Sequence, residues 1–203
     1  MAKRVEGVTE KLLECAKDEF LHKGYENASL REIAERAGSS KGAIYIRYPD
    51  KESLFQALVQ PAADGLHSLL SSMLDDFETM SGEVKKEQVH SFSDDGFPNL
   101  IQYIYEHFEE FKLLVTCAPG TMYQEFLESL VALDTRCTRR FLQESGSRAL
   151  AENRITDGFL HVVSSAFYSG IFEAVIHDMP QEEAKLYINE LRMFYSNGWK
   201  AYY

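Results

Sequence analysis

Three residues constrain the fold of the stretch between residues 30 and 47: Ala34, Gly38 and Ile44. A small residue lets two helices approach closely, and a glycine four positions later allows a tight turn between them. An apolar residue six positions further on packs the second helix against the first. This spacing is that of a helix-turn-helix. A plain helical hairpin with a glycine turn fits the same three positions, so the spacing alone leaves both open.

The residues before this turn predict two helices. Apolar residues three and four positions apart predict a first helix over about residues 4–22, and Gly24 supplies a stop. Ser29, with Glu32 three positions later, has the capping-box pattern and predicts a short second helix that ends near Ala37. The apolar face of the first helix consists of Val5, Val8, Leu12, Cys15, Ala16 and Phe20.

A third helix is predicted over residues 41–47, with Ser39 or Ser40 as its cap. In a helix-turn-helix this element enters the major groove of DNA with its N-terminal residues toward the bases. Small or flexible residues there allow a close approach, and Lys41 can contact phosphate or guanine. The candidate DNA-contacting residues from this argument are Ser39, Ser40, Lys41, Gly42 and Ala43.

Five short patterns extend this prediction to a family resemblance. They are Lys-Gly-Tyr after the first helix, the Ile-Ala-x-x-Ala-Gly turn, Ser-Lys-Gly at the start of the third helix, Tyr45, and an aromatic-Pro-x-Lys-x-x-Leu entry to a fourth helix. Over about residues 4–58 the chain closely resembles the DNA-binding domain of the TetR family of bacterial transcriptional regulators. Arg47-Tyr48 replaces a common His-Phe, and Ala43 stands where Thr or Ser is common. Base preference therefore does not follow from relatives.

The resemblance implies further contacts with DNA. Tyr45 and Lys51 are expected to donate to phosphate, which positions the protein without reading the sequence. Arg47 adds a further candidate phosphate contact. Ser29 either donates to phosphate or only caps its helix, and Tyr45 has the alternative role of a packed aromatic.

Charge separates the two parts of the chain. The net charge is -11, yet residues 1–60 carry ten basic and ten acidic residues, so all of the acidic excess lies in residues 61–203. The N-terminal part is therefore compatible with a polyanionic partner. The resemblance implies two domains, a helix-turn-helix DNA-binding domain at residues 1–50 and an effector-binding and dimerisation domain at residues 51–203.

The remainder of the chain predicts an all-α fold. A helix is expected from about Lys51, kinked or split at Pro61, and the polar residues 79–96 are expected to form a loop with at most a short helix. Further helices are predicted at about residues 98–116, 120–144, 156–178 and 181–202, with Pro98 and Pro180 at helix starts. No strand pattern competes with these assignments.

The last two helices carry more apolar surface than one core contact buries, which predicts a dimer interface. The TetR resemblance implies a homodimer in which each subunit contributes two helices to a four-helix bundle. Such a dimer would place two recognition helices on a near-palindromic operator in double-stranded DNA. A monomer in which these helices are simply buried is the alternative. The apolar residues are Phe159, Leu160, Val162, Val163, Ala166, Phe167, Ile171, Ala174 and Val175, followed by Tyr187, Ile188, Leu191, Phe194, Tyr195, Trp199 and Tyr202.

The resemblance also implies a pocket for a small-molecule effector among the central C-terminal helices. Aromatic, methionine and histidine side chains favour an apolar or aromatic ligand. Each of these side chains also fits a purely structural role in the core. The candidate lining residues are Tyr103, His107, Met122, Tyr123, Phe126, His161 and Tyr168.

Several classes of function lack support in the sequence. Catalytic and metal-binding motifs are absent and the six histidines are scattered, so neither an enzyme nor a cofactor or metal site is predicted. The longest uncharged stretch, residues 158–172, is shorter than a membrane span, and no signal peptide is visible, which predicts a cytoplasmic protein. Cys117 or Cys137 as a redox sensor, or a helical protein-interaction module, remain alternatives to a ligand-released repressor.

Overall fold

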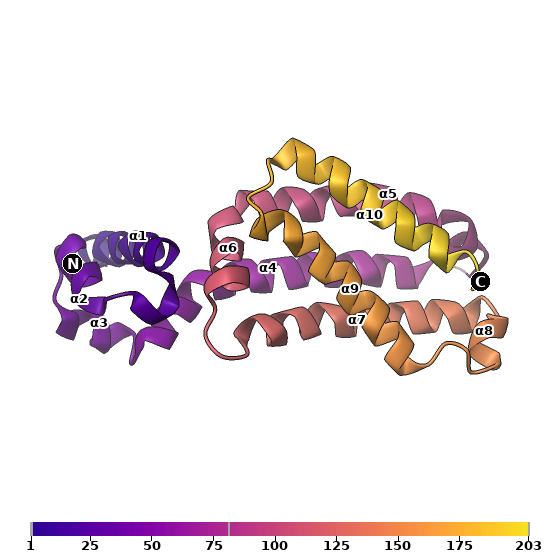
Figure 1. Ribbon diagram of the computed structural model, residues 1–203, viewed down its shortest axis with the longest axis horizontal. Coiled ribbons are helices and arrows are strands. Elements are labelled where there is room, and N and C mark those ends of the chain that lie inside the picture. The colour runs from indigo at the N-terminus through magenta and orange to yellow at the C-terminus, as the bar shows by residue number, and fades with distance from the viewer. Residues whose placement is uncertain (1, 81, 203) are drawn as a thin grey trace. The chain divides into compact units, whose positions relative to one another are not determined.

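A computed structural model describes residues 2–80 and 82–202, with side chains described for residues 9–80, 84, 85 and 96–202. These residues form α-helices joined by turns, and they contain no strand, which confirms the predicted all-α class (Figure 1). Val5 and Val8, predicted for the first helix face, lie outside the described side chains. The helices are α1 (Ala2–Asn27), α2 (Leu30–Arg36), α3 (Lys41–Arg47), α4 (Lys51–Thr79), α5 (Gly82–Glu106), α6 (Phe108–Cys117), α7 (Met122–Glu144), α8 (Arg148–Ala151), α9 (Asp157–Ile176) and α10 (Gln181–Trp199).

The chain forms two compact units whose limits differ from the expected boundary at residue 50. The N-terminal unit extends to Asp64 and also takes in His107–Tyr123, so it contains α6. The C-terminal unit consists of Gly65–Glu106 and the residues from Gln124 onward. The boundary falls inside α4, which continues past Pro61 without being split.

Aromatic packing builds the core of the N-terminal unit. Phe20 of α1 meets Phe55 of α4 edge to face, with 5.1 Å between ring centroids, and Tyr25 stacks on Phe20. Helix α6 packs against α1, where the Lys17 ammonium lies 2.7 Å from a Glu109 carboxylate oxygen. The unit that presents α3 is therefore held by contacts of α1 with α4 and α6.

The joint between α1 and α2 depends on a buried carboxylate. Gly24 interrupts α1 with φ of 71°, as the predicted stop requires. The cap of α2 forms only half of the predicted capping box, because the Ser29 hydroxyl accepts from Glu32 N while the Ser29 N–H donates to Glu19 at 3.1 Å. Glu19 is 3% exposed and also lies 2.9 Å from the Lys23 ammonium.

The predicted loop at residues 79–96 is wrong, because residues 82–96 belong to α5, with Pro98 inside the helix. Tertiary contacts explain a helix here despite weak apolar periodicity. The buried Lys85 ammonium pairs with Glu144 of α7 at 2.6 Å, and Gly96 leaves room for the side chain of Met73 on α4. The helix predicted over residues 98–116 is also interrupted at His107, between α5 and α6.

Helices α9 and α10 pack against each other within the C-terminal unit, close to their predicted limits (Figure 1). Among the described residues, α9 is the one helix long and apolar enough to cross a membrane by length and composition. The sequence predicts no such segment, because the uncharged residues 158–172 alone are too short to span a membrane. A core helix has the same composition. Leu160, Phe172 and Val175 of α9 are buried inside the unit, which accounts for this apolar character.

Candidate nucleic-acid interface and ligand cavity

The turn between α2 and α3 is built as the sequence spacing predicts. Gly38 adopts φ of 65°, a conformation that disfavours side chains, and α2 ends in a Schellman motif. In this motif the Ser39 N–H donates to Ala34 O at 2.8 Å, and the Gly38 N–H donates to Glu35 O at 3.2 Å. Ala34 is buried, which allows the two helices to approach.

Helix α3 is anchored through one side and exposed on the other. Ser40 caps it by accepting from Ala43 N at 3.2 Å, so of the two predicted caps Ser40 is the one used. Ile44 is 0% exposed and holds α3 against the unit, while Tyr45 is 44% and Ile46 87% exposed. A two-turn helix fixed in this way presents a rigid outer face.

The predicted DNA-contacting residues lie on or beside this face. Lys41 projects from the start of α3, with its ammonium 5.6 Å from the centroid of the Tyr45 ring. Exposed members of the set are Ser40, Lys41, Gly42 and Tyr45, and partly exposed members are Ser29, Ser39, Ala43, Arg47 and Lys51.

Lys51 has a structural role in addition to the predicted one. Its ammonium donates to Glu26 O at 3.0 Å and to Ala28 O at 3.3 Å, and it lies 4.6 Å from the centroid of the Tyr25 ring. An ammonium has three donors, so these bonds leave one for a phosphate. Lys51 therefore ties the start of α4 to the end of α1.

Ile46 is the residue of this face that sequence reasoning missed. It immediately follows Tyr45 and is the most exposed of the large apolar side chains in the described structure. An apolar side chain in the major groove can contact the methyl group of thymine. The sequence could have predicted this exposure, because a residue two positions after the buried Ile44 points to a different face of the helix.

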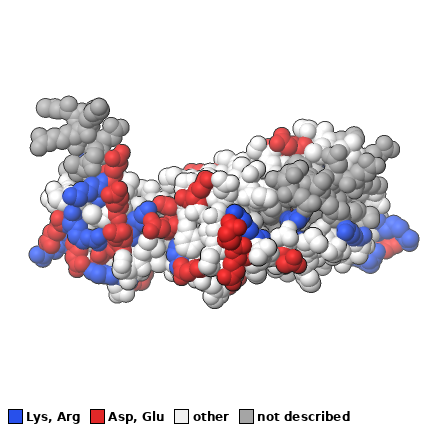
Figure 2. Space-filling model, turned by 90° about the horizontal axis from the view of Figure 1, so that it is seen from above, with Lys and Arg blue, Asp and Glu red and all other residues white. Residues whose placement is uncertain are grey.

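Charges of both signs are interleaved over the N-terminal unit on the face that Figure 2 shows. Acidic residues of α1 and α2 pair with nearby basic ones, as in the contact between Arg36 and Asp18 at 2.7 Å and that between Arg31 and Glu35 at 2.9 Å. These pairs neutralise the flanks of the motif locally. The basic residues predicted to meet DNA lie instead at α3 and at the start of α4.

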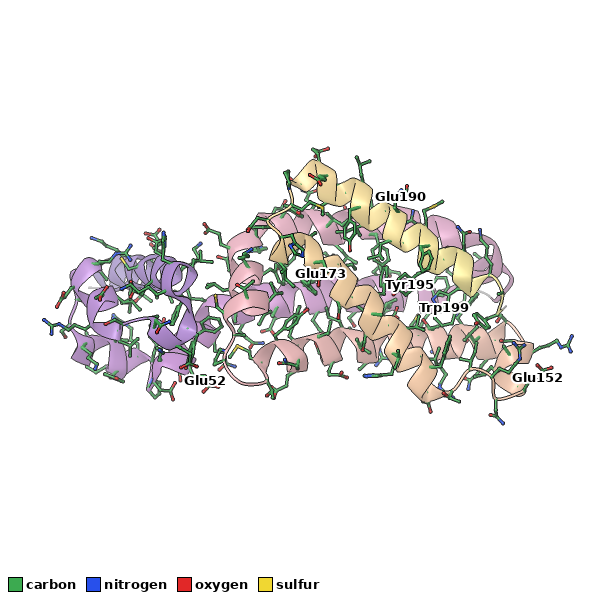
Figure 3. The ribbon with its side chains drawn as sticks, viewed as in Figure 1. Glu52, Glu152, Glu173, Glu190, Tyr195 and Trp199 are labelled. Atoms are coloured by element: carbon green, nitrogen blue, oxygen red, sulfur yellow. The ribbon has the colours of Figure 1, made fainter. Side chains whose placement is uncertain are left out.

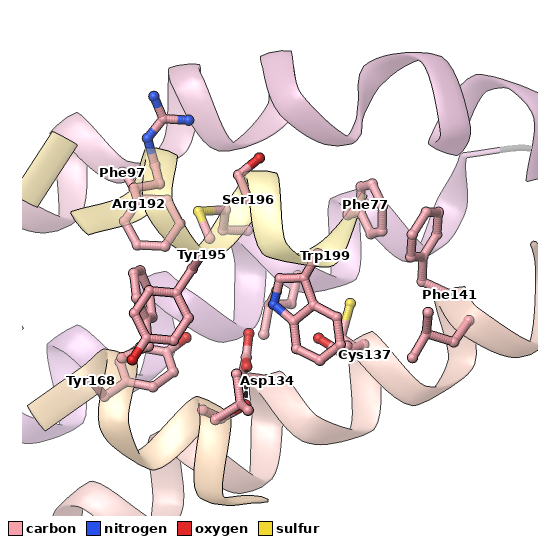
Figure 4. Close-up of a pocket in the computed structure, with 17 residues that line it drawn as sticks. Phe77, Phe97, Asp134, Cys137, Phe141, Tyr168, Arg192, Tyr195, Ser196 and Trp199 are labelled. Atoms are coloured by element: carbon pink, nitrogen blue, oxygen red, sulfur yellow. Dashed lines mark hydrogen bonds between the residues drawn. The ribbon is translucent and has the colours of Figure 1, made fainter. Parts of the chain in front are cut away.

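A cavity of about 160 Å³ lies inside the C-terminal unit (Figure 4). Aromatic side chains form much of its wall, and Tyr195 and Trp199 reach it from α10 (Figures 3 and 4). Its lining residues come from five helices, and they are Met73, Leu74 and Phe77 of α4, Phe97 of α5, Asp134, Cys137, Thr138, Phe141 and Leu142 of α7, Val163, Ser164, Phe167 and Tyr168 of α9, and Arg192, Tyr195, Ser196 and Trp199 of α10.

Two polar groups of the cavity wall, one from α7 and one from α9, bond to each other. The Ser164 hydroxyl donates to Asp134 at 2.5 Å. Burial raises the pKa of Asp134, an effect that this hydrogen bond only partly opposes. Burial, with the nearby charge of Asp134, also raises the pKa of the Cys137 thiol to about 12. A thiol with so little thiolate is a poor redox sensor.

The predicted pocket residues are dispersed, and of the seven only Tyr168 lines this cavity. Phe126 packs edge to face on Phe172 in the core, and the hydroxyl of Tyr103 lies over Gly65. His161 is an exposed residue 3.6 Å from Glu128. His107, Met122 and Tyr123 belong to the N-terminal unit. The side chains that do line the cavity come from distant helices and share no sequence signal.

Known proteins match this chain in two ways. Residues 12–58 match the family model described as bacterial regulatory proteins, tetR family. The transcriptional repressors AcnR of Corynebacterium glutamicum and Corynebacterium efficiens are each 37% identical over 78 residues, which is 34% of this chain and 42% of theirs. The aligned part thus spans less than half the length of these relatives. The TetR-family regulator PfmR of Thermus thermophilus has the same fold, with a TM-score of 0.56, 18% identity, and coverage of 90% of this chain and 96% of its own.

The matched residues include the whole of α2 and α3, with their caps and the turn between them. The N-terminal part of the chain is therefore similar in sequence to the DNA-binding region of the TetR family, and the whole chain has the fold of a solved TetR-family regulator.

Proposed function

We propose that this protein is a dimeric, sequence-specific transcriptional regulator of the cytoplasm, a repressor that a small-molecule ligand releases from its operator. The observation that carries the proposal is the geometry of α3, which is anchored by the buried Ile44 and exposes Lys41, Tyr45 and Ile46. A helix held in this way suits insertion into the major groove. Lys41, Tyr45, Arg47 and Lys51 supply donors for phosphate.

Exposed apolar residues on α9 and α10 support dimerisation. Val162 of α9 is 63% exposed and Phe194 of α10 is 76% exposed, and both lie in the C-terminal unit. Leu186 and Met193 of α10 and Phe159 of α9 extend this exposed set. A second copy of the chain would bury it, as symmetric dimers do. Sedimentation analysis should show a dimer, and a Phe194→Glu substitution should shift it toward the monomer.

Helix α4 offers a route from ligand to DNA. It begins at Lys51, which is bonded to the end of α1, and further along it carries Met73, Leu74 and Phe77 of the cavity wall. A ligand that favours one arrangement of this helix would change operator affinity by its differential binding, typically by about 1–3 kcal/mol.

Selection of bound duplexes from a random DNA library tests the proposal without knowledge of the ligand. A dimeric regulator should enrich a near-palindromic motif with two half-sites. The affinity for the enriched duplex should fall steeply as salt rises, because phosphate contacts release counterions. A folded, dimeric protein that enriches no motif would contradict sequence-specific binding by the protein without ligand.

A further inference from the structure

Asp134 is the one acidic residue among the 17 that line the cavity. Its carboxylate lies between Tyr168 and Trp199 in the close-up, on the side of the cavity that α7 forms (Figure 4). The side chain is only partly exposed, and limiting the contact of a carboxylate with water is costly unless the protein supplies partners for it. Its position inside the unit therefore needs an explanation.

The fold satisfies this carboxylate only in part. Ser164 contributes one hydrogen bond, whereas an ionised carboxylate has acceptor capacity for about four. Cys137 and Tyr168 beside it cannot carry a positive charge, and their raised pKa values keep both side chains neutral. Unused acceptor capacity thus faces an apolar cavity.

The single basic residue of the lining does not neutralise Asp134. Arg192 of α10 donates through its guanidinium to Asn189 of the same helix at 2.9 Å. The close-up draws its guanidinium directed away from the carboxylate (Figure 4). The charge that would best complement Asp134 is therefore one that a ligand brings.

The walls of the cavity suit the same kind of ligand. Tyr195 meets Phe167 with 5.1 Å between ring centroids, and Phe167 also meets Tyr168 at 5.4 Å. Aromatic rings attract cations through their faces and accommodate apolar groups as well. A cavity of comparable volume in another protein holds one benzene ring.

We propose that the cavity binds an organic cation, an aromatic or aliphatic amine whose ammonium group pairs with Asp134 while its apolar part packs among the rings of α9 and α10. The inference rests on the proposed function, because it gives the chemical class of the effector. It adds a charge to the apolar or aromatic ligand that the sequence predicts.

A matched pair of probes isolates the role of the charge. Benzylammonium and benzyl alcohol have the same aromatic ring and the same number of heavy atoms, but only the first is a cation. Trp199 is the single tryptophan of the chain and lines the cavity, so its fluorescence reports binding, and calorimetry supplies an independent measurement. The wild-type protein should bind benzylammonium at least about tenfold more tightly than benzyl alcohol, which corresponds to about 1.4 kcal/mol.

Asp134→Asn removes the charge but keeps the shape of the side chain and an acceptor for Ser164. This variant should lose the preference for benzylammonium and retain its affinity for benzyl alcohol. The control is Glu190→Gln, which removes one negative charge from an exposed position on α10 and should leave the preference unchanged (Figure 3). Equal affinities for the two probes in the wild type, binding of neither, or a preference that survives Asp134→Asn would each overturn the proposal.

These measurements need no DNA, so they are independent of the proposed function. If benzylammonium binds through Asp134 and leaves operator affinity unchanged, the cation site stands and release by this ligand fails. If an operator is selected and neither probe binds, DNA recognition stands and the cation site fails.

Discussion

Each unit of this protein contains a carboxylate packed inside its fold, with Glu19 buried and Asp134 partly buried, and the two differ in the partners that the fold provides. Glu19 in the N-terminal unit has the Lys23 ammonium at 2.9 Å, the Arg36 guanidinium at 3.8 Å and the Ser29 N–H at 3.1 Å. Asp134 in the C-terminal unit has a hydrogen bond from Ser164. The first carboxylate is part of what holds the fold together, whereas the second costs stability and needs a partner from outside.

The pKa shifts express the same difference. Burial alone would raise the pKa of Glu19, but the hydrogen bonds from Lys23 and Ser29 and the charges of Lys23 and Arg36 hold it below its ordinary value. Burial raises the pKa of Asp134, and one hydrogen bond does not reverse the effect. A titratable group that has a shifted pKa and few hydrogen-bonding or charged partners in the fold is a candidate for function.

The largest expected effect is that of Glu19→Ala. The substitution leaves the Ser29 N–H at the start of α2 without its partner and removes the link to Lys23, so we expect a loss of about 3 kcal/mol in the free energy of unfolding. Denaturant unfolding monitored by circular dichroism measures it. Glu35→Ala, which removes an exposed carboxylate paired with Arg31, should change stability by less than about 0.5 kcal/mol.

Acid should abolish the contribution of Glu19. Because its pKa is lower in the folded than in the unfolded protein, its stabilising effect is present above the unfolded pKa and is lost as pH falls through the folded pKa. The difference in stability between wild type and Glu19→Ala should therefore shrink on acidification. A difference that stays constant would show that packing, and not charge, explains the effect.

The helix-turn-helix of the N-terminal unit was predictable from sequence, whereas the contacts of Glu19 and the cavity were not. The spacing of Ala34, Gly38 and Ile44 defines a local turn, so its signal lies within eleven residues. Glu19 acts across the turn between α1 and α2, and its role requires the fold to be known. The cavity brings together residues of five helices from α4 to α10, and apolar periodicity predicts helices without predicting how they pair.

Lys51→Ala should have the next largest effect, because it tests a residue with two roles. Loss of its bonds to Glu26 O and Ala28 O should lower stability by about 1–2 kcal/mol. Loss of a phosphate contact should weaken binding to all DNA sequences alike and reduce the salt dependence. Thermal unfolding and binding titrations at several salt concentrations separate the two effects. Unchanged stability would mean that the bonds to α1 contribute little.

Asp134→Asn should act in the opposite direction and raise the free energy of unfolding by about 1 kcal/mol near neutral pH. It removes a negative charge that has a single hydrogen bond, from Ser164, to compensate it. The folded pKa of Asp134 is raised, so its ionisation costs stability as pH rises through that value. Below the unfolded pKa both states hold the proton, and the gain from the substitution should disappear. A destabilised variant at neutral pH would mean that the protein itself compensates the carboxylate.

Ile46→Ala should have the smallest effect on stability, within about 0.5 kcal/mol, because the side chain is 87% exposed. Its effect should appear on DNA instead, since an apolar side chain on the outer face of α3 contributes nothing to folding and can contact a thymine methyl group. Replacing individual thymines of a selected operator with deoxyuridine removes those methyl groups one at a time. The wild type should lose affinity at one position in each half-site, by up to about tenfold, and the Ile46→Ala variant should be insensitive there. If both proteins respond equally at every position, Ile46 does not contact a thymine methyl group.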